Sequence, residues 1–280
     1  MSKVNHDLRS NDGKTIFLPP EIAGTDGQGN LKIPNVYSES ATQLYPIGTK
    51  FVDGERVFHY AYAGGALGAT RGQVGYIVRT ASAVPSYDAS QAAGAGTVAN
   101  PLKINGSSAG TPAKNAYAGQ FIVIFSNTLG NVTHRIISNS ISAYDSVYTT
   151  QYTTELVLDQ PTPVAVEANT NCDIFPSRYA DVRTPNDLTA GMYPFLGVPL
   201  RLITALRYFW IQTWGPCFIT HNTADEIGDN QHWRAVVFYS DGTLKALHEM
   251  TALSDSGQIA GYTLATNGSG SEWTMLMLDR

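Results

Sequence analysis

From Tyr45 onward, apolar and polar residues alternate along the chain, and tight-turn signals interrupt the alternation. The stretch 45–65 ("YPIGTKFVDGERVFHYAYAGG") alternates on both sides of Asp53-Gly54, a dipeptide that accepts the positive φ of a tight hairpin turn. The stretch 233–248 repeats this pattern around Asp241-Gly242, and the stretch 257–279 places Asn267 to Gly270 between two apolar runs. These patterns predict three β-hairpins.

Short runs rich in β-branched and aromatic residues fill the middle of the chain, separated by Asn, Gly, Pro and Asp. They are "QFIVIFSNT", "VTHRIISNSISAY", "TELVLDQPTPVAV" and "NCDIFPS". Helical periodicity is largely missing. The exception is 195–208, where Leu200, Ile203, Leu206 and Tyr208 could lie at helical spacing, but Pro199 and the β-rich residues that follow favour a strand. The predicted fold class is mainly β, an antiparallel sandwich or barrel with long loops.

Two regions depart from this texture. Residues 1–44 are polar and punctuated by Gly, Pro and Asn, which predicts an extended N-terminal arm, with a floppy terminus as the alternative. Residues 81–119 are dominated by small residues, which predicts a loop-rich excursion with room for one short helix and for a second lobe. We therefore expect an arm over 1–44 and a β-rich domain over 45–280.

The segment 207–222 ("RYFWIQTWGPCFITHN") is aromatic and almost uncharged. As a strand it would place Tyr208, Trp210, Gln212 and Trp214 on one face, and Phe209, Ile211 and Thr213 on the other. Large residues on both faces indicate a strand buried on both sides, either between two layers or against another subunit. An exposed aromatic row that stacks on sugars is the functional alternative. Gly215-Pro216 is expected to end the strand.

Composition limits the classes of partner. Charged residues make up 15% of the 280 residues and the net charge is -5, with no Lys/Arg cluster, so we expect no nucleic-acid partner. No apolar run reaches the roughly 18–20 residues that span a bilayer, and the N-terminus lacks the apolar region of a signal peptide, so we expect no membrane partner. Cys172 and Cys217 fit no metal or disulfide pattern and are predicted to be buried free thiols.

Candidate catalytic motifs are weak. "GSSAG" at 106–110 matches the nucleophile-elbow pattern around Ser108, but no helix follows, so a loop is predicted. The segment 221–232 collects the metal-ligating types His221, Asp225, Glu226, Asp229 and His232. Their spacing fits no standard zinc or calcium pattern, which favours a solvated turn over an ion site between His221 and His232.

Nucleotide binding has no support either. Gly94-x-Gly96 lacks a third glycine and a preceding strand, and no phosphate-binding loop occurs in the sequence. We therefore assign no catalytic, cofactor-binding or metal residue, and expect a protein that is not an enzyme.

Three segments together resemble structural proteins of tailed bacteriophage virions, and are similar to head decoration (cement) proteins. They are the early pair "x-G-T-x-x-x-x-G-x-R-x-F-x-Y-A" around 48–61, the aromatic "W-x-Q-T-W-G" at 210–215 and the closing pair that begins "I-A-G-Y-T-L" at 259–264. The resemblance implies a β-rich fold, assembly in many copies, often as a homotrimer, and binding to the major capsid protein. It also implies a location on the virion capsid surface, after synthesis in the bacterial host cytoplasm.

Two other functions stay open at this point. A tail or adsorption protein would bind host glycans through Tyr208, Trp210 and Trp214. A hydrolase would use the acidic and histidine residues of 221–232.

Overall fold

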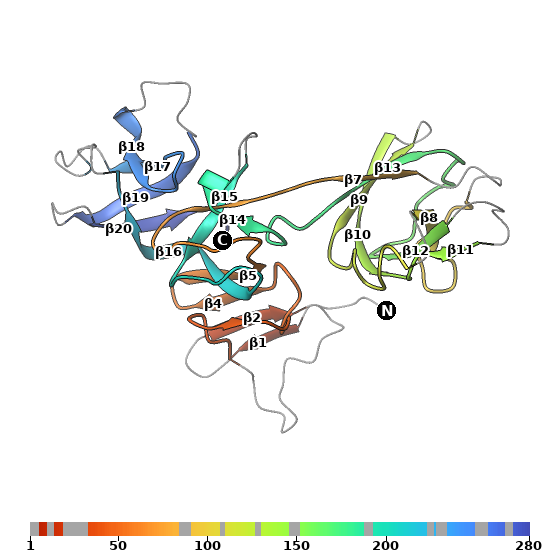
Figure 1. Ribbon diagram of the computed structural model, residues 1–280, viewed down its shortest axis with the longest axis horizontal. Helices are drawn as coiled ribbons and strands as arrows, with labels where there is room; N and C mark the ends of the chain where they lie inside the picture. The colour runs from red at the N-terminus through yellow and green to blue at the C-terminus, as the bar shows by residue number, and fades with distance from the viewer. Residues whose placement is uncertain are drawn as a thin grey trace. The chain divides into compact units, whose positions relative to one another are not determined.

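The chain folds into two compact units whose regular structure is mainly β (Figure 1). The computed structural model describes residues 6–9, 14–18, 33–83, 91–106, 110–126, 130–145, 152–187, 193–222, 227, 234–249, 257–266 and 271–280. The first unit comprises Met1–Tyr76 and Arg178–Arg280, and the second comprises Ile77–Ser177. The named strands pair antiparallel, and the helical elements within the described ranges are two 3-10 turns, Pro185–Asp187 and Leu247–Glu249. The prediction of a mainly β, antiparallel fold is confirmed.

The first unit is built on one long curled sheet in the order β1-β2-β4-β5-β16-β20-β19-β17-β18. Its strands are β1 His6–Arg9, β2 Lys14–Leu18, β4 Lys50–Asp53, β5 Arg56–Tyr62, β16 Tyr208–Thr220, β17 Ala235–Phe238, β18 Leu244–Ala246, β19 Ile259–Thr266 and β20 Ser271–Met277. Four short strands branch from it: β3 Glu39–Ser40, β6 Gln73–Gly75, β14 Val182–Arg183 and β15 Phe195–Pro199. β15 pairs with both β16 and β6, which places the branch beside the centre of the sheet.

All three predicted hairpins are present. β4 and β5 are joined at Gly54, whose φ is +61°, and Asp53 pairs with Arg56 across the turn. β17 and β18 are joined through Gly242 at φ +83°, and β19 pairs with β20. The sequence 6–18, expected within an extended arm, instead holds the hairpin β1–β2, and β2 pairs with β4. Strands β1 and β2, which lie within the predicted arm, therefore form the end of the sheet because β2 is hydrogen-bonded to β4.

The central strand, β16, passes through Gly215-Pro216 without ending, so the prediction of a break there is wrong. Before this point β16 pairs with β5, and from Trp214 onward it pairs with β20. The register with β5 shifts between Gln212 and Trp214, which marks a β-bulge. Gly215 has φ +96°, and a Cβ there would lie 2.3 Å from the Glu55 carbonyl oxygen. Glycine therefore lets the strand bend and change partners where another residue would stop it.

The side chain of Gln212 stabilises this bulge. Its Nε2 donates to the carbonyl oxygens of Trp214, at 3.1 Å, and Pro216, at 2.9 Å. Gln212 is fully buried, so these bonds replace water for two carbonyls near the bulge.

Both faces of β16 are buried before the bulge, as the sequence predicted. Phe209 and Ile211 pack with residues of β5, β14 and β15 on one face. On the other face Trp210, 3% exposed, packs edge-on against Tyr45 and Phe51 and lies against Tyr60. After the bulge, Cys217 and Ile219 enter a third cluster, formed with inward residues of β17–β20 and with β6 and β15. The strand is therefore shared by three parts of the first unit's core.

The second unit is a separate curled sheet in the order β11-β12-β10-β9-β13-β7, and β8 pairs with β12. Its strands are β7 Thr80–Ala83, β8 Leu102–Gly106, β9 Phe121–Ser126, β10 Gly130–Asn139, β11 Ala143–Tyr144, β12 Tyr152–Leu158 and β13 Asn171–Phe175. The hydroxyl of Ser82 on β7 donates to the Asn105 carbonyl on β8 at 3.1 Å, which brings the two ends of the sheet together. The curled sheet encloses an aliphatic core of its own.

The described residues of 81–119 are mostly turns and loops, as predicted, and they belong to the second unit, but two strands were not foreseen. The region contributes β8 and most of β7, and its described residues contain turns and no helix. Leu102 and Ile104 alternate into the core. The Gln91 side chain forms hydrogen bonds with both the N–H and the carbonyl of Lys103. Strand pairing and side-chain hydrogen bonds thus hold this stretch of small residues in place. The compact unit itself extends to Ser177.

In 195–208, strand β15 confirms the preference for a strand, and the rest is irregular, with Leu206 at φ +59°.

We predict that Gly215→Ala destabilises the first unit by at least about 3 kcal/mol, because positive φ and a backbone clash act together. Gly54→Ala is the matched control: its φ is also positive, but its Cβ would meet open space, so a cost of about 1–2 kcal/mol is expected. All four tryptophans lie in the first unit, so urea unfolding followed by tryptophan fluorescence reports on that unit. If both variants lost the same unfolding free energy, a backbone clash at position 215 would be contradicted.

Candidate functional site

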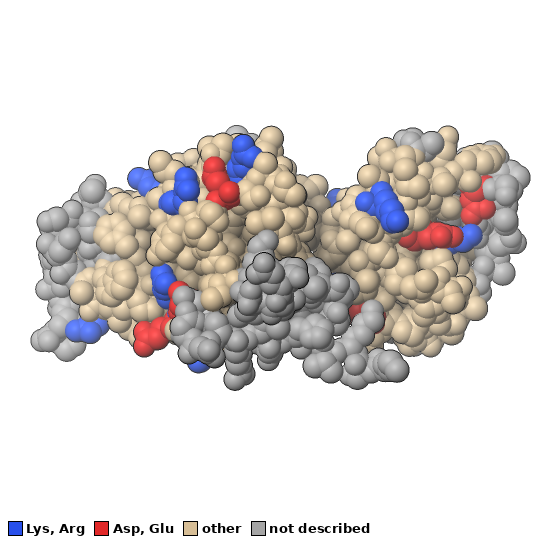
Figure 2. Space-filling model, turned by 90° about the horizontal axis from the view of Figure 1, so that it is seen from below, with Lys and Arg blue, Asp and Glu red and all other residues tan. Residues whose placement is uncertain are grey.

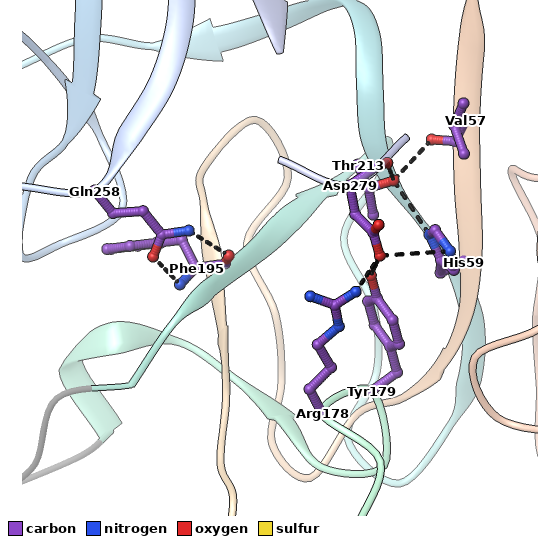
Figure 3. Close-up of polar contacts among 8 residues, drawn as sticks. All are labelled: Val57, His59, Arg178, Tyr179, Phe195, Thr213, Gln258 and Asp279. Atoms are coloured by element: carbon purple, nitrogen blue, oxygen red, sulfur yellow. Dashed lines mark hydrogen bonds and ion pairs between the residues drawn. The ribbon is translucent and has the colours of Figure 1, made fainter. Parts of the chain in front are cut away.

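A polar cluster in the first unit gathers around Asp279, the penultimate residue of the sequence (Figure 3). The Arg178 guanidinium and the Tyr179 hydroxyl, the latter at 2.8 Å, both donate to Asp279 Oδ2. His59 Nε2 lies 3.6 Å from the same oxygen. Residues from β5, the start of the 178–187 segment and the C-terminal end of the chain thus meet at one carboxylate. Their separation in sequence explains why sequence analysis did not find this cluster.

His59 is enclosed within this cluster. Its side chain is 8% exposed, and its ring stacks on Tyr179 with centroids 4.8 Å apart and planes 4° apart. Desolvation lowers the pKa of His59 to about 4; nearby Arg178 and Lys50 act in the same direction, and Asp279 opposes them. The imidazole is therefore neutral at pH 7.

The geometry favours a structural role over catalysis. The Nδ1 of His59 lies 3.2 Å from Thr213 Oγ1, and the Thr213 hydroxyl also contacts the Asp279 carbonyl oxygen at 2.6 Å. Both ring nitrogens of His59 thus face groups of the cluster itself, leaving neither directed at a substrate. A general base needs a pKa near the working pH, whereas the pKa of His59 is lowered to about 4. The cluster instead ties the end of the chain to β5 and β16.

The two cysteines are buried free thiols, as predicted. Burial raises the pKa of both thiols to about 12. The nucleophilic thiolate is therefore negligible at neutral pH.

Most of the other sequence candidates lie outside the described residues. Ser108 lies outside the described residues, as do Asp225, Glu226, Asp229 and His232, whereas His221 forms an isolated bridge with Leu244 of β18. Within the described residues, no group of three or more His, Cys, Asp or Glu could hold a metal ion. Gly94 and Gly96 have φ of +90° and +97°, and a Cβ at Gly96 would strike Leu158, so these glycines serve a turn.

A pocket of about 220 Å³ lies beside the aromatic cluster of β16. Its apolar lining comprises Ile33, Pro34, Leu44, Tyr45, Tyr60, Tyr208 and Trp210. This volume is below the roughly 300–1,000 Å³ of small-molecule sites. Several of its polar groups are engaged locally: the Tyr60 hydroxyl accepts from Leu44 N–H, and the Glu39 carboxylate accepts from Thr204. The pocket therefore offers few polar contacts for orienting a ligand.

A different feature is open to solvent: the outer face of β16 after the bulge, β20 and β19. We call this surface the outer face and define it by Trp214, Pro216, Phe218, Ile259, Tyr262, Leu264, Trp273, Met275 and Met277. Phe218 pairs directly with Trp273, and Met275 lies between Pro216 and Tyr262. Sequence analysis missed this face, although one signal was present: the three strands together contain a single charged residue, Glu272.

Charged side chains elsewhere are dispersed. Among the described residues on the face shown in Figure 2, Lys, Arg, Asp and Glu lie apart or beside opposite charges and form no broad patch of one sign. In the described part of the chain, no helix has the length and apolar character needed to cross a membrane.

Comparison with known proteins found no similar protein. No protein-family model, curated protein or solved structure matches it.

The His59 cluster predicts a specific pH dependence of stability. The pKa of His59 is lower in the folded protein than the ordinary 6.5 of the unfolded chain, so the unfolded state takes up the proton first as pH falls. Protonation of His59 should therefore not change the free energy of unfolding above about pH 6.5. Between pH 6.5 and 4 it should lower this free energy by up to about 3 kcal/mol. His59→Gln should remove this component. Urea unfolding at several pH values measures the difference, and equal slopes in the two proteins would refute it.

Proposed function

We propose that this chain is a non-enzymatic structural protein of a tailed-bacteriophage virion, a head decoration or cement protein that bridges subunits of the shell. Such a protein acts by mass action: many copies that bind the assembled shell, and not its separate parts, lower the free energy of the assembled state. The partner is the major capsid protein, and the location is the capsid surface.

The observation that carries this proposal is the position of the three segments on which the resemblance rests. They correspond to β4–β5, β16 and β19–β20, which are consecutive neighbours in one sheet, in the order β4-β5-β16-β20-β19. Segments up to about 200 residues apart in sequence therefore form one continuous structural module. The three motifs that carry the resemblance thus belong to one structural module, which supports treating them as one signature.

The character of the sites gives further support. The groups of the polar cluster at Asp279 bond to one another, and the outer face is apolar, with one charged residue in its three strands. Contact surfaces with fully buried centres are depleted in charged residues and enriched in aromatic residues and Met. This chemistry suits lasting protein contacts.

Copy number in purified particles of the source tests the proposal. Quantitative mass spectrometry should find this chain in an amount comparable with the major shell protein. A handful of copies per particle would point to the tail or portal instead, and absence from particles would remove the virion role.

The glycan-binding alternative requires the face of the Trp210 ring to be accessible, whereas this ring is 3% exposed and surrounded by aromatic side chains. We therefore predict that Trp210→Ala costs the first unit about 3–5 kcal/mol of unfolding free energy. Trp214→Ala, at a half-buried ring beneath the Arg280 guanidinium, should cost clearly less. Urea unfolding and a glycan-array assay distinguish the alternatives: a Trp210→Ala protein of unchanged stability that had lost glycan binding would favour the adsorption role.

A further inference from the structure

The distribution of polarity across β19 and β20 departs from that in an ordinary sheet with one solvated side, although Ala260 and Leu276 do face the core. Thr263 and Thr274 pair with each other on the inner side and are 4% and 0% exposed. Neither hydroxyl has a hydrogen-bond partner among the described residues. The outer side carries Trp273, Tyr262 and the methionines instead. A sheet that faced water would place threonine outside and the large apolar residues inside.

The exposed apolar side chains of the outer face are adjacent to one another. Phe218 and Trp273, 42% and 46% exposed, are directly paired across β16 and β20. Tyr262 and Met277, each 42% exposed, lie on the neighbouring strand β19 and further along β20. Directly paired residues on one side of a sheet have Cβ atoms roughly 4.5–5.5 Å apart, so these side chains form one surface.

The area of this surface matches one side of a protein interface. With Ile259 and Leu264, the six most exposed side chains present on the order of 600 Å², which approaches the roughly 800 Å² that each partner buries in a standard stable interface. Exposed apolar patches on monomers rarely exceed this size.

The distribution of charge indicates which partner binds the outer face. Copies of a chain with net charge -5 repel one another, and this repulsion is weakest where two surfaces without charge approach. The three strands of the outer face contain one charged residue between them, so there is little on this face with which a charged partner could pair. An apolar face needs no charge complementarity to match a copy of itself.

We infer that the outer face of β16, β19 and β20 binds the same face of a second copy of this chain, forming a two-fold dimer in which two sheets pack face to face. Face-to-face packing of sheets about 10 Å apart is the ordinary arrangement of β-sandwiches, and a self-complementary patch generates two-fold symmetry. The trimer implied by the family resemblance would instead require two different surfaces. This inference rests on the first unit alone and does not depend on the virion role.

The test measures the mass of the purified full chain over a range of concentrations, by sedimentation equilibrium. The wild-type chain should be a dimer that dissociates on dilution. Phe218→Asp and Trp273→Asp should each raise the dissociation constant at least about thirtyfold, as expected for an interface hot spot. Leu202→Asp is the control: Leu202 is 69% exposed in the same unit but lies outside the outer face, so its dissociation constant should not change.

A cross-linking experiment keeps the inference testable if an aspartate variant fails to fold. Met275→Cys places a thiol at the middle of the outer face, and the two natural cysteines are buried. A short bis-maleimide should then link two copies of Met275→Cys and not of Leu202→Cys.

A monomer at all concentrations, a trimer, or a dimer unaffected by the face variants would overturn the inference. If the wild-type chain is monomeric but Phe218→Asp and Trp273→Asp lose binding to capsids, the outer face belongs to the shell protein, and the virion role stands without the dimer. A dimer that dissociates in the face variants, in a chain absent from particles, would leave the dimer and remove the virion role.

Discussion

The first unit depends on a single bulge in its longest strand. Gly215 has no Cβ, and the space that a Cβ would need is occupied by the Glu55 carbonyl oxygen, 2.3 Å away. The close approach allows β16 to remain in the sheet while its partner changes from β5 to β20. The β4–β5 and β19–β20 hairpins therefore share one central strand, and they meet at the bulge, where Trp214 pairs with both β5 and β20. Before the bulge both faces of β16 are buried, and after it one face of β16 is apolar and exposed.

The end of the chain completes this bulge. The register shift with β5 passes over Thr213, so its carbonyl is not paired with β5 in the regular ladder. That carbonyl accepts from the N–H groups of Leu278 and Asp279, at 3.1 and 3.2 Å. The Asp279 carboxylate is in turn held by Arg178 and Tyr179, and the Thr213 hydroxyl contacts the Asp279 carbonyl oxygen. The cluster that contains His59 thus lies where the last residues satisfy a backbone group left by the bulge, which gives its polar residues a structural role.

Local sequence was sufficient for the features that local physics decides. Glycine at positive φ after aspartate located two hairpins, and large residues on both faces of 208–214 indicated the buried centre of the sheet. Sequence reasoning failed where a distant backbone sets the outcome. Gly215-Pro216 looks like a strand end, and nothing near it in sequence shows that Glu55 and the C-terminal residues lie beside it. The Asp279 cluster escaped notice for the same reason, since His59 and Asp279 are 220 positions apart in sequence.

The exposed face follows from the same constraint. Once β16 bends at Gly215, the sheet of β17–β20 curls around its own core, which Cys217, Ile219, Val236 and Leu276 fill from the inner side. The outer side chains of β16, β19 and β20 are then excluded from that core by the strict alternation of a strand. A sequence under selection to face water would replace them with polar residues at little cost to packing, because they contribute little to the interior. The aromatic residues and methionines there, above a buried pair of threonines, fit the inferred contact of this face with another protein.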